Sequence, residues 1–254
     1  MSTRKKPAAP PLPEVHFSDY GNVRCLHLGT AWIQGSMDLD APYDIELEYV
    51  QRMMAWLLFV APSSVGKRHA MQLGLGAAAL TKFCRKKLRM KTTAIEINPQ
   101  VVHACRGWFK LPPEDGKLSV VVADAAQEIR DPRWAGTVDA LQVDLYDDEA
   151  AAPVLDSADF YRDCRALLTE SGAMTVNLFG RDASYAQSLA KIVEAFGAEA
   201  VWAFKATREG NSVVLALRTP QPLDRAEIAA RGDAIQERWG LPAAKWAKVF
   251  KPVG

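Results

Sequence analysis

The most restrictive stretch of this sequence is a glycine turn between an apolar run and an alanine-rich segment. The apolar run 69–73 ends in Gly-Leu-Gly at 74–76 and passes directly into residues that favour a helix. The next apolar run closes on Glu96 and Ile97. This order predicts a strand, a tight turn and a helix, then a second strand whose acidic end accepts ribose hydroxyls. The third glycine of a dinucleotide fingerprint is absent, so the pattern indicates a nucleoside site rather than a pyrophosphate site.

Charge and composition favour a small-molecule partner. The chain has 31 basic and 30 acidic residues, so no general electrostatic attraction to nucleic acid or to a membrane surface is expected. No apolar segment reaches the roughly 18–20 residues that span a bilayer. The proline-rich stretch 7–13 lacks the apolar core of a signal peptide. A hydrophobic content of 49% is enough for one large domain with a small appendage.

The cysteines and histidines form no pattern of a metal site or a disulfide framework. The cysteines are widely spaced within apolar runs, and they are Cys25, Cys84, Cys105 and Cys164. We expect them to be reduced, buried thiols in a cytoplasmic protein. The four histidines also lack the spacing of metal ligands, so no metal is expected.

Strand and helix patterns alternate along most of the chain after residue 68. Strands are predicted at 69–73, 92–97, 118–122, 138–143, 173–178, 198–204 and 212–218, and helices at 77–88, 99–109, 125–130, 157–168, 183–196 and 224–238. Such alternation is typical of an α/β fold with a mostly parallel sheet, here seven-stranded, between two layers of helices. The connection 208–211 is too short for a helical crossover and predicts a C-terminal antiparallel hairpin. This arrangement resembles the Rossmann-like fold of class I S-adenosylmethionine-dependent methyltransferases.

Four parts are predicted along the chain. They are a disordered tail at 1–14, a small N-terminal β element at 15–43, a Rossmann-like nucleoside-binding catalytic domain at 44–220, and a C-terminal helix and tail at 221–254.

The segments outside the alternating region are predicted as follows. The β element has strand patterns at 15–18, 23–28 and 31–34. A single helix over 44–60 then leads into the main domain. Near the C-terminus, the basic and apolar residues of 245–251 favour docking onto the domain or onto a second copy rather than nucleic-acid binding.

Polar residues follow successive strands of the predicted sheet. They are the glycine turn 74–76, Glu96, Asp124, the acidic run 144–148, and Asn177. A glycine turn alone can serve helix packing, but the carboxyl ends of parallel strands open onto one crevice, so together these residues predict a nucleoside site. Glu96 can accept from a ribose and Asp124 from an adenine amine, while Ala125 flanks the base. The predicted donor-binding residues are Gly74, Leu75, Gly76, Glu96, Ile97, Asp124, Ala125 and Asp144.

Several segments together resemble one family, the spermidine synthase (polyamine aminopropyltransferase) family. The segments that carry the resemblance, in order and spacing, are 72–76, 94–102, 122–125, 138–148 and 159–173. The resemblance covers about residues 17 to 218. It implies decarboxylated S-adenosylmethionine as donor, a polyamine as acceptor, methylthioadenosine as by-product, and a homodimer.

The same resemblance assigns roles in the acidic run. Asp144 matches the catalytic aspartate of the family, and Asp147 matches the second acid of its D-x-x-D pattern. Tyr146 and Asp148 are candidates for orienting the amine. An acidic turn at a helix N-terminus is the alternative interpretation of Asp147 and Asp148.

Two segments depart from the family pattern. Ala77 and Ala78 stand where the family's glycine loop carries an acid that meets the donor amine. The Tyr-His-Glu acceptor signature is replaced by a segment ending in Glu48 and Tyr49, which can line an acceptor pocket or serve helix packing.

Three functional hypotheses therefore remain at this point. The first is aminopropyl transfer from decarboxylated S-adenosylmethionine to a polyamine. The second is methyl transfer from S-adenosylmethionine itself, since the same fold serves both reactions. The third is a non-catalytic nucleoside-binding homologue.

Overall fold

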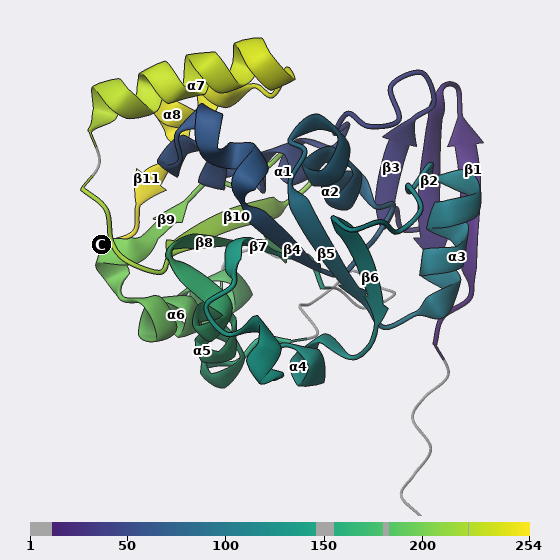
Figure 1. Ribbon diagram of the computed structural model, residues 1–254, viewed down its shortest axis with the longest axis horizontal. Helices are drawn as coiled ribbons and strands as arrows, with labels where there is room; N and C mark the ends of the chain where they lie inside the picture. Colours follow the sequence, from purple (N-terminus) through teal and green to yellow (C-terminus); the bar gives the residue numbers. More distant parts are fainter. Residues whose placement is uncertain (1–11, 146–154, 180–182, 223) are drawn as a thin grey trace, which may run out of the picture.

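The fold consists of a large mixed sheet covered by helices and a separate small sheet near the N-terminus (Figure 1). This computed structural model describes residues 12–145, 155–179, 183–222 and 224–254. Tyr146, Asp147 and Asp148, and most of the predicted N-terminal tail, therefore lie outside the described residues.

The large sheet has a parallel centre and an antiparallel side. Its strands, in spatial order, are β11 (Lys251–Pro252), β9 (Val201–Ala203), β10 (Asn211–Leu217), β8 (Leu168–Phe179), β7 (Val138–Val143), β4 (His69–Leu73), β5 (Lys91–Glu96) and β6 (Leu118–Val122). The strands from β8 to β6 run parallel to their neighbours, whereas β10, β9 and β11 pair antiparallel. The predicted α/β fold and its antiparallel hairpin are confirmed. The predicted strand number of seven is wrong, because β11 pairs with β9 and adds a strand.

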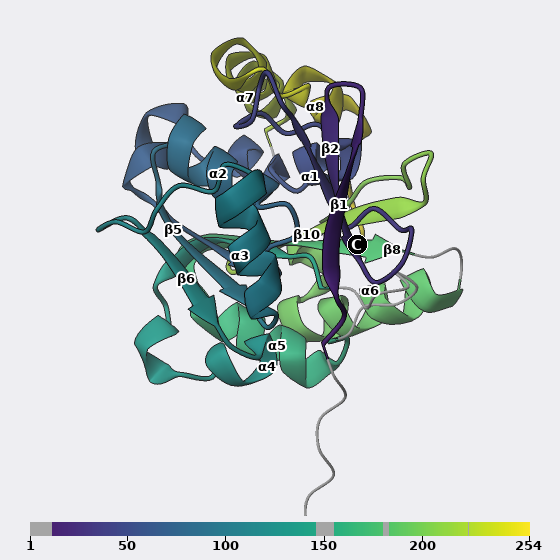
Figure 2. The same cartoon turned by 90° about the vertical axis from the view of Figure 1, so that its right-hand side faces the viewer.

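The helices lie on both faces of this sheet. They are α1 (Glu48–Arg52), α2 (Ala79–Lys82), α3 (Pro99–Trp108), α4 (Ala125–Glu128), α5 (Ala158–Leu167), α6 (Ala183–Phe196), α7 (Arg225–Trp239) and α8 (Ala243–Val249). In both views α5 and α6 cover one face, while α1, α2 and α7 lie on the other (Figures 1 and 2). No helix of the described ranges is long and apolar enough to cross a membrane.

The small sheet consists of β1 (Val15–Tyr20), β2 (Val23–Leu28) and β3 (Gly35–Asp38), all antiparallel. The third strand was predicted at 31–34, and this placement is wrong. Trp32 and Ile33 are exposed in the connection, whereas Ser36 and Met37, three and four residues after Ile33, are buried and pair with β2. The prediction, which relied on apolar residue type alone, therefore placed this strand a few residues too early.

The predicted helix over 44–60 is also wrong, because it is broken into α1 and a 3₁₀ segment at Ala55–Phe59. The Met53 carbonyl accepts a hydrogen bond from the Thr175 hydroxyl, at 2.9 Å, instead of continuing the α-helical ladder. The Leu57 N–H then bonds the Met54 carbonyl three residues back, which is the 3₁₀ pattern. A tertiary hydrogen bond from the sheet thus interrupts the helix.

The helix predicted at 77–88 is shorter and irregular. It begins at Ala79 and passes into a π-helical turn at Phe83–Lys87. Ala78 precedes it with φ +58°, a left-handed conformation that costs a non-glycine residue about 1–2 kcal/mol.

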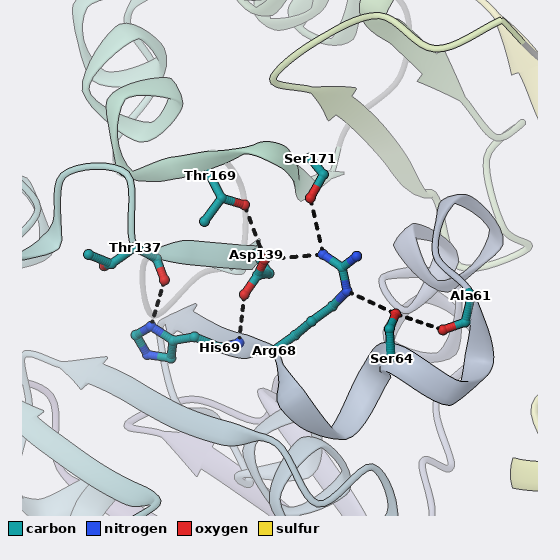
Figure 3. A network of polar contacts seen from close by, with 8 residues as sticks. All are labelled: Ala61, Ser64, Arg68, His69, Thr137, Asp139, Thr169 and Ser171. Carbon is teal, nitrogen blue, oxygen red and sulfur yellow. Dashed lines mark hydrogen bonds and ion pairs between the residues drawn. The ribbon is translucent and has the colours of Figure 1, made fainter.

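A polar network fastens the amino ends of the central strands (Figure 3). Asp139 lies at an irregularity between β7 and β8, and its carboxylate accepts from the His69 backbone N–H, from Arg68 and from the Thr169 hydroxyl, at 2.9, 3.1 and 3.1 Å. The His69 ring is buried, which lowers its pKa, and its Nδ1–H donates to the Thr137 carbonyl at 3.2 Å. This network fixes the strand ends opposite to those that carry the polar residues predicted above.

The C-terminal segment docks onto the domain, which is one of the two placements predicted for residues 245–251. Phe250 packs against Phe204 with ring centroids 4.6 Å apart, and Trp246 is buried beside them. The Arg231 guanidinium donates to the Leu58 carbonyl at 2.9 Å, which joins α7 to the segment after α1.

Candidate active site

The glycine turn between β4 and α2 is confined on both sides by backbone. Gly74 has φ +88° and Gly76 has φ +50°. A Cβ on Gly74 would lie 2.2 Å from the Asp144 carbonyl oxygen, and one on Gly76 would lie 3.0 Å from the Gln34 carbonyl oxygen. Glycine is therefore required at Gly74 both by its dihedral angle and by the close approach of β7.

Glu96 ties this turn to the end of β5. One carboxylate oxygen accepts from the Leu75 backbone N–H and the other from the Asn98 backbone N–H, both at 2.9 Å. Burial raises the pKa of Glu96, and the backbone donors oppose that shift. Each oxygen keeps a further lone pair, so the carboxylate can still accept from ligand hydroxyls.

The next strand end presents Asp124 as the N-cap of α4. Its carboxylate accepts from the Ala126 backbone N–H at 2.9 Å and from the Gln127 amide at 3.2 Å. Ala125 is buried behind it, whereas the Ile97 side chain at the neighbouring strand end is 53% exposed. An exposed isoleucine beside a capped carboxylate offers an apolar surface and an acceptor, the two features that an adenine ring requires.

Asp144 ends β7 directly beside the glycine turn. Its backbone N–H bonds the Leu73 carbonyl at 3.0 Å. One carboxylate oxygen accepts from the Asn177 amide at 3.0 Å, and the other faces the Tyr49 hydroxyl at 3.4 Å, which is long for a hydrogen bond. Burial raises the pKa of Asp144, while these two donors act in the opposite direction.

A narrow cavity connects these groups. It is lined by β3, α1, the glycine turn and Asp144, and the residues with polar side chains among its lining are Gln34, Ser36, Tyr49 and Asp144. Its volume is about 20 Å³, enough for about one water molecule. A ligand larger than water therefore has to displace lining side chains.

Ala77 and Ala78 show what replaces the loop acid. Both are buried, and a Cβ on Gly35 would lie 2.7 Å from the Ala77 backbone nitrogen, so β3 lies directly on this part of the turn. The position that the family resemblance reserves for an acid is thus closed by methyl groups and a covering strand.

The structure brings most of the predicted residues to one end of the sheet. Gly74, Leu75, Glu96 and Asp144 are joined by direct contacts, and Asp124 with its apolar neighbours lies at the adjoining strand ends. The predicted Tyr146 and Asp147 lie outside the described residues. Within the described ranges, His, Cys, Asp and Glu form no group of three or more that could hold a metal ion.

Two asparagines, and the polar residues that line the cavity at β3, were not recognised as site residues. Asn177 was noted only as a strand end, and Asn211, Gln34 and Ser36 were not singled out. Asn211 and Ser212 open the run 211–217, which is apolar from Val213 on, and a polar residue at the buried start of such a strand is the signal that could have identified Asn211.

Comparison with known proteins gives the family. No model of a known protein family matches the sequence. The chain is 33% identical to the polyamine aminopropyltransferase of Chromobacterium violaceum over 250 residues, which cover 98% of this chain and 93% of that protein. The chain belongs to the polyamine aminopropyltransferase family. It is also 33% identical to the enzyme of that name from Neisseria meningitidis serogroup A, over 94% of this chain and 89% of that protein.

Solved structures agree with this family on the fold. A probable spermidine synthase from Corynebacterium glutamicum superposes with a TM-score of 0.73 at 17% identity, covering 92% of this chain and 90% of that one. Human methyltransferase-like protein 13, solved in complex with SAH, gives 0.69 at 21% identity, covering 77% and 93%. A spermidine synthase in complex with the transition-state analogue AdoDATO gives 0.57 at 16% identity, covering 89% and 88%. Aminopropyltransferases and methyltransferases therefore share the fold of this chain.

Proposed function

We propose that this chain transfers an aminopropyl group from decarboxylated S-adenosylmethionine to a polyamine acceptor. The observation that carries the proposal is the Asp144 carboxylate, which lies beside the glycine turn with the Asn177 amide and the Tyr49 hydroxyl directed at it. Membership of the polyamine aminopropyltransferase family supports the same reaction.

The reaction needs a base at this position. An aliphatic amine resembles lysine, with a pKa of about 10.4, and is mostly protonated at neutral pH. Its neutral form attacks the methylene carbon bonded to the sulfonium, the carbon–sulfur bond breaks, and the electron pair goes to sulfur to give methylthioadenosine. The proton released from the amine nitrogen passes to Asp144. The raised pKa of this buried carboxyl makes it a better base than an exposed aspartate.

The remaining residues have roles that follow from their chemistry. Glu96 accepts from the ribose hydroxyls, Asp124 accepts from the adenine amine, and Ile97 with Ala125 flanks the base. Asp147 and Tyr146, from the family pattern, hold and orient the acceptor amine.

Methyl transfer from S-adenosylmethionine is the second candidate, and the buried Ala77 and Ala78 favour it. A decarboxylated donor ends in an ammonium group, and the missing loop acid removes a charge-assisted contact of about 1.5–3 kcal/mol. S-adenosylmethionine keeps its carboxylate beside the amine, so its binding depends less on an acid in the loop.

Calorimetry with both donors, followed by product analysis, separates these functions. We expect tighter binding of decarboxylated S-adenosylmethionine, and methylthioadenosine formation when putrescine is added. Asp144→Asn should reduce that turnover by about 10²–10⁴-fold, the usual contribution of a general base. Tighter binding of S-adenosylmethionine with formation of S-adenosylhomocysteine would favour methyl transfer. Binding without turnover of either donor would favour a non-catalytic homologue.

The family resemblance also leads us to propose a cytoplasmic homodimer. Light scattering of the purified chain should then give twice the protomer mass of 27.9 kDa. A mass equal to that of one protomer at micromolar concentration would contradict the dimer.

A further inference from the structure

A chain of hydrogen bonds reaches Asp144 from two neighbouring strands. The Asn211 amide, at the start of β10, donates to the Asn177 amide oxygen at 3.2 Å. The Asn177 amide nitrogen, on β8, donates to the Asp144 carboxylate at 3.0 Å. Asn177 is 3% exposed and Asn211 is 9% exposed. Two buried polar side chains are therefore aligned behind one functional carboxylate.

The chemistry of the groups fixes the direction of this chain. A carboxylate can only accept, so Asn177 has to turn its NH₂ group toward Asp144. The Asn177 amide oxygen then faces Asn211, which has to supply a donor. A reversed Asn177 amide would place its oxygen against the carboxylate and its NH₂ against the Asn211 NH₂. The Asn211 NH₂ therefore reinforces the orientation of Asn177 that favours an ionised Asp144.

The backbone holds Asn211 in place. Its N–H bonds the Thr207 hydroxyl at 3.2 Å, and its carbonyl accepts from the Thr207 N–H at 2.7 Å. The antiparallel register then pairs Val213 with Asn177, which brings the first residue of β10 to the end of β8. The Asn211 amide, which donates to Asn177, is therefore attached to a turn that backbone hydrogen bonds close.

Within the described ranges, the other polar groups that face Asp144 are uncharged, which leaves the hydrogen-bond chain an important electrostatic role. The Tyr49 hydroxyl from α1 lies at the long distance of 3.4 Å, and the glycine turn presents the Gly74 backbone. Neither group carries a charge at neutral pH. Burial raises the pKa of Asp144, and the Asn177 donor is the largest opposing contribution.

We propose that Asn177 and Asn211 are positioning residues for Asp144. Asn211 holds the Asn177 amide with its NH₂ toward the carboxylate, and this keeps Asp144 ionised and correctly oriented beside the glycine turn. The proposal rests on the proposed function only for its kinetic consequence, because the hydrogen-bond chain also acts on Asp144 in the ligand-free protein.

Titration of the Asp144 side chain tests the proposal without any need for turnover. The carboxyl ¹³C signal of Asp144, assigned with Asp144→Asn, is followed against pH in the wild type and in the near-isosteric variants Asn177→Leu and Asn211→Leu. We expect the Asp144 pKa to rise by about one unit in Asn177→Leu, through the loss of a hydrogen bond to a charged group. The rise in Asn211→Leu should be smaller and in the same direction.

Ser212→Ala is the matched control. Ser212 is the next residue of β10 and is also buried, but its side chain lies on the opposite face of the strand. We expect the Asp144 titration to be unchanged in this variant. If either leucine variant does not fold, Asn177→Ala or Asn211→Ala serves instead, because alanine removes the donor without adding a charge and should also raise the Asp144 pKa.

Kinetics give a second readout. The acid limb of the pH profile of kcat/KM for methylthioadenosine formation should move to higher pH together with the Asp144 titration. In Asn177→Leu, kcat/KM one pH unit below the shifted limb should be about a tenth of its plateau value. Transfer by the wild type with unshifted titrations in the variants would overturn the positioning role and leave the proposed function standing. If the wild type shows no transfer, the proposed function fails, and the carboxyl titration alone decides the positioning role.

Discussion

Among the described glycines, Gly74 is the position where an added methyl group would come closest to another atom. The left-handed φ of +88° costs a non-glycine residue about 1–2 kcal/mol. The new methyl group would also lie 2.2 Å from the Asp144 carbonyl oxygen, and relief of such overpacking costs about 1–3 kcal/mol. We therefore expect Gly74→Ala to lower the free energy of unfolding by about 2–5 kcal/mol.

Urea and thermal unfolding measure this effect. For a chain of this length, the melting temperature should fall by roughly 2–4 °C per kcal/mol, about 4–20 °C in total. Since the atom that has to move belongs to the backbone of Asp144, turnover should fall further than the folded fraction does.

Gly107→Ala is the control for this prediction. Gly107 lies in α3, and a Cβ there would meet no atom within 4 Å. Alanine in a helix should stabilise the protein by about 0.5–1 kcal/mol. If Gly74→Ala unfolds within about 0.5 kcal/mol of the wild type, the range of ordinary surface substitutions, the argument from close approach is refuted.

Three further predictions follow from buried charges and their partners. Burial raises the pKa of Asp144, so turnover should fall with decreasing pH through a limb above the range of a free aspartate, and a pH–rate profile with no loss down to about pH 4 would contradict its role as base. Burial lowers the pKa of Lys82 from 10.5 to about 8, so between these pH values the unfolded chain binds a proton that the folded chain does not. From pH 8 to pH 10.5, the free energy of unfolding of the wild type in urea should therefore rise by about 3 kcal/mol relative to that of Lys82→Met. Parallel pH dependences of the two proteins would refute this. Asp139→Asn should lower the free energy of unfolding by about 1.5–3 kcal/mol, because it weakens the hydrogen bonds to Arg68 and His69 (Figure 3). Calorimetry should show an unchanged affinity for the donor. If the folded variant binds the donor more weakly, the two ends of the sheet are coupled.

Most of the parallel strands were predictable from the sequence because β4, β5 and β7 are almost continuously buried. β4, β6 and β7 have the predicted bounds; β6 at the sheet edge is only partly buried, whereas β4 and β7 are buried runs of mostly apolar residues. The same property made Glu96 and Asp144 visible, because each is the polar residue that closes such a run. The short third strand of the small sheet lacks this property, and its apolar neighbours misled the prediction.

The rest depends on contacts between distant parts of the chain. The break after α1 is set by Thr175, which lies on β8 and bonds the Met53 carbonyl. The alignment of Asn211 with Asn177 depends on the register of β10 against β8. Local propensity and periodicity contain no information about either pairing, so both had to come from the structure.

The last residues of the chain complete a core that its first third begins. The Phe59 ring, in the 3₁₀ segment after α1, packs against both Trp202 and Phe250, with centroid distances of 6.0 and 6.2 Å. During vectorial synthesis this ring has no final partner until the C-terminal segment leaves the ribosome. The packing of the segment after α1 is thus completed by residues that are synthesised much later. A chain that ends before Phe250 should therefore leave the Phe59 and Trp202 rings without this partner and be less stable than the full sequence.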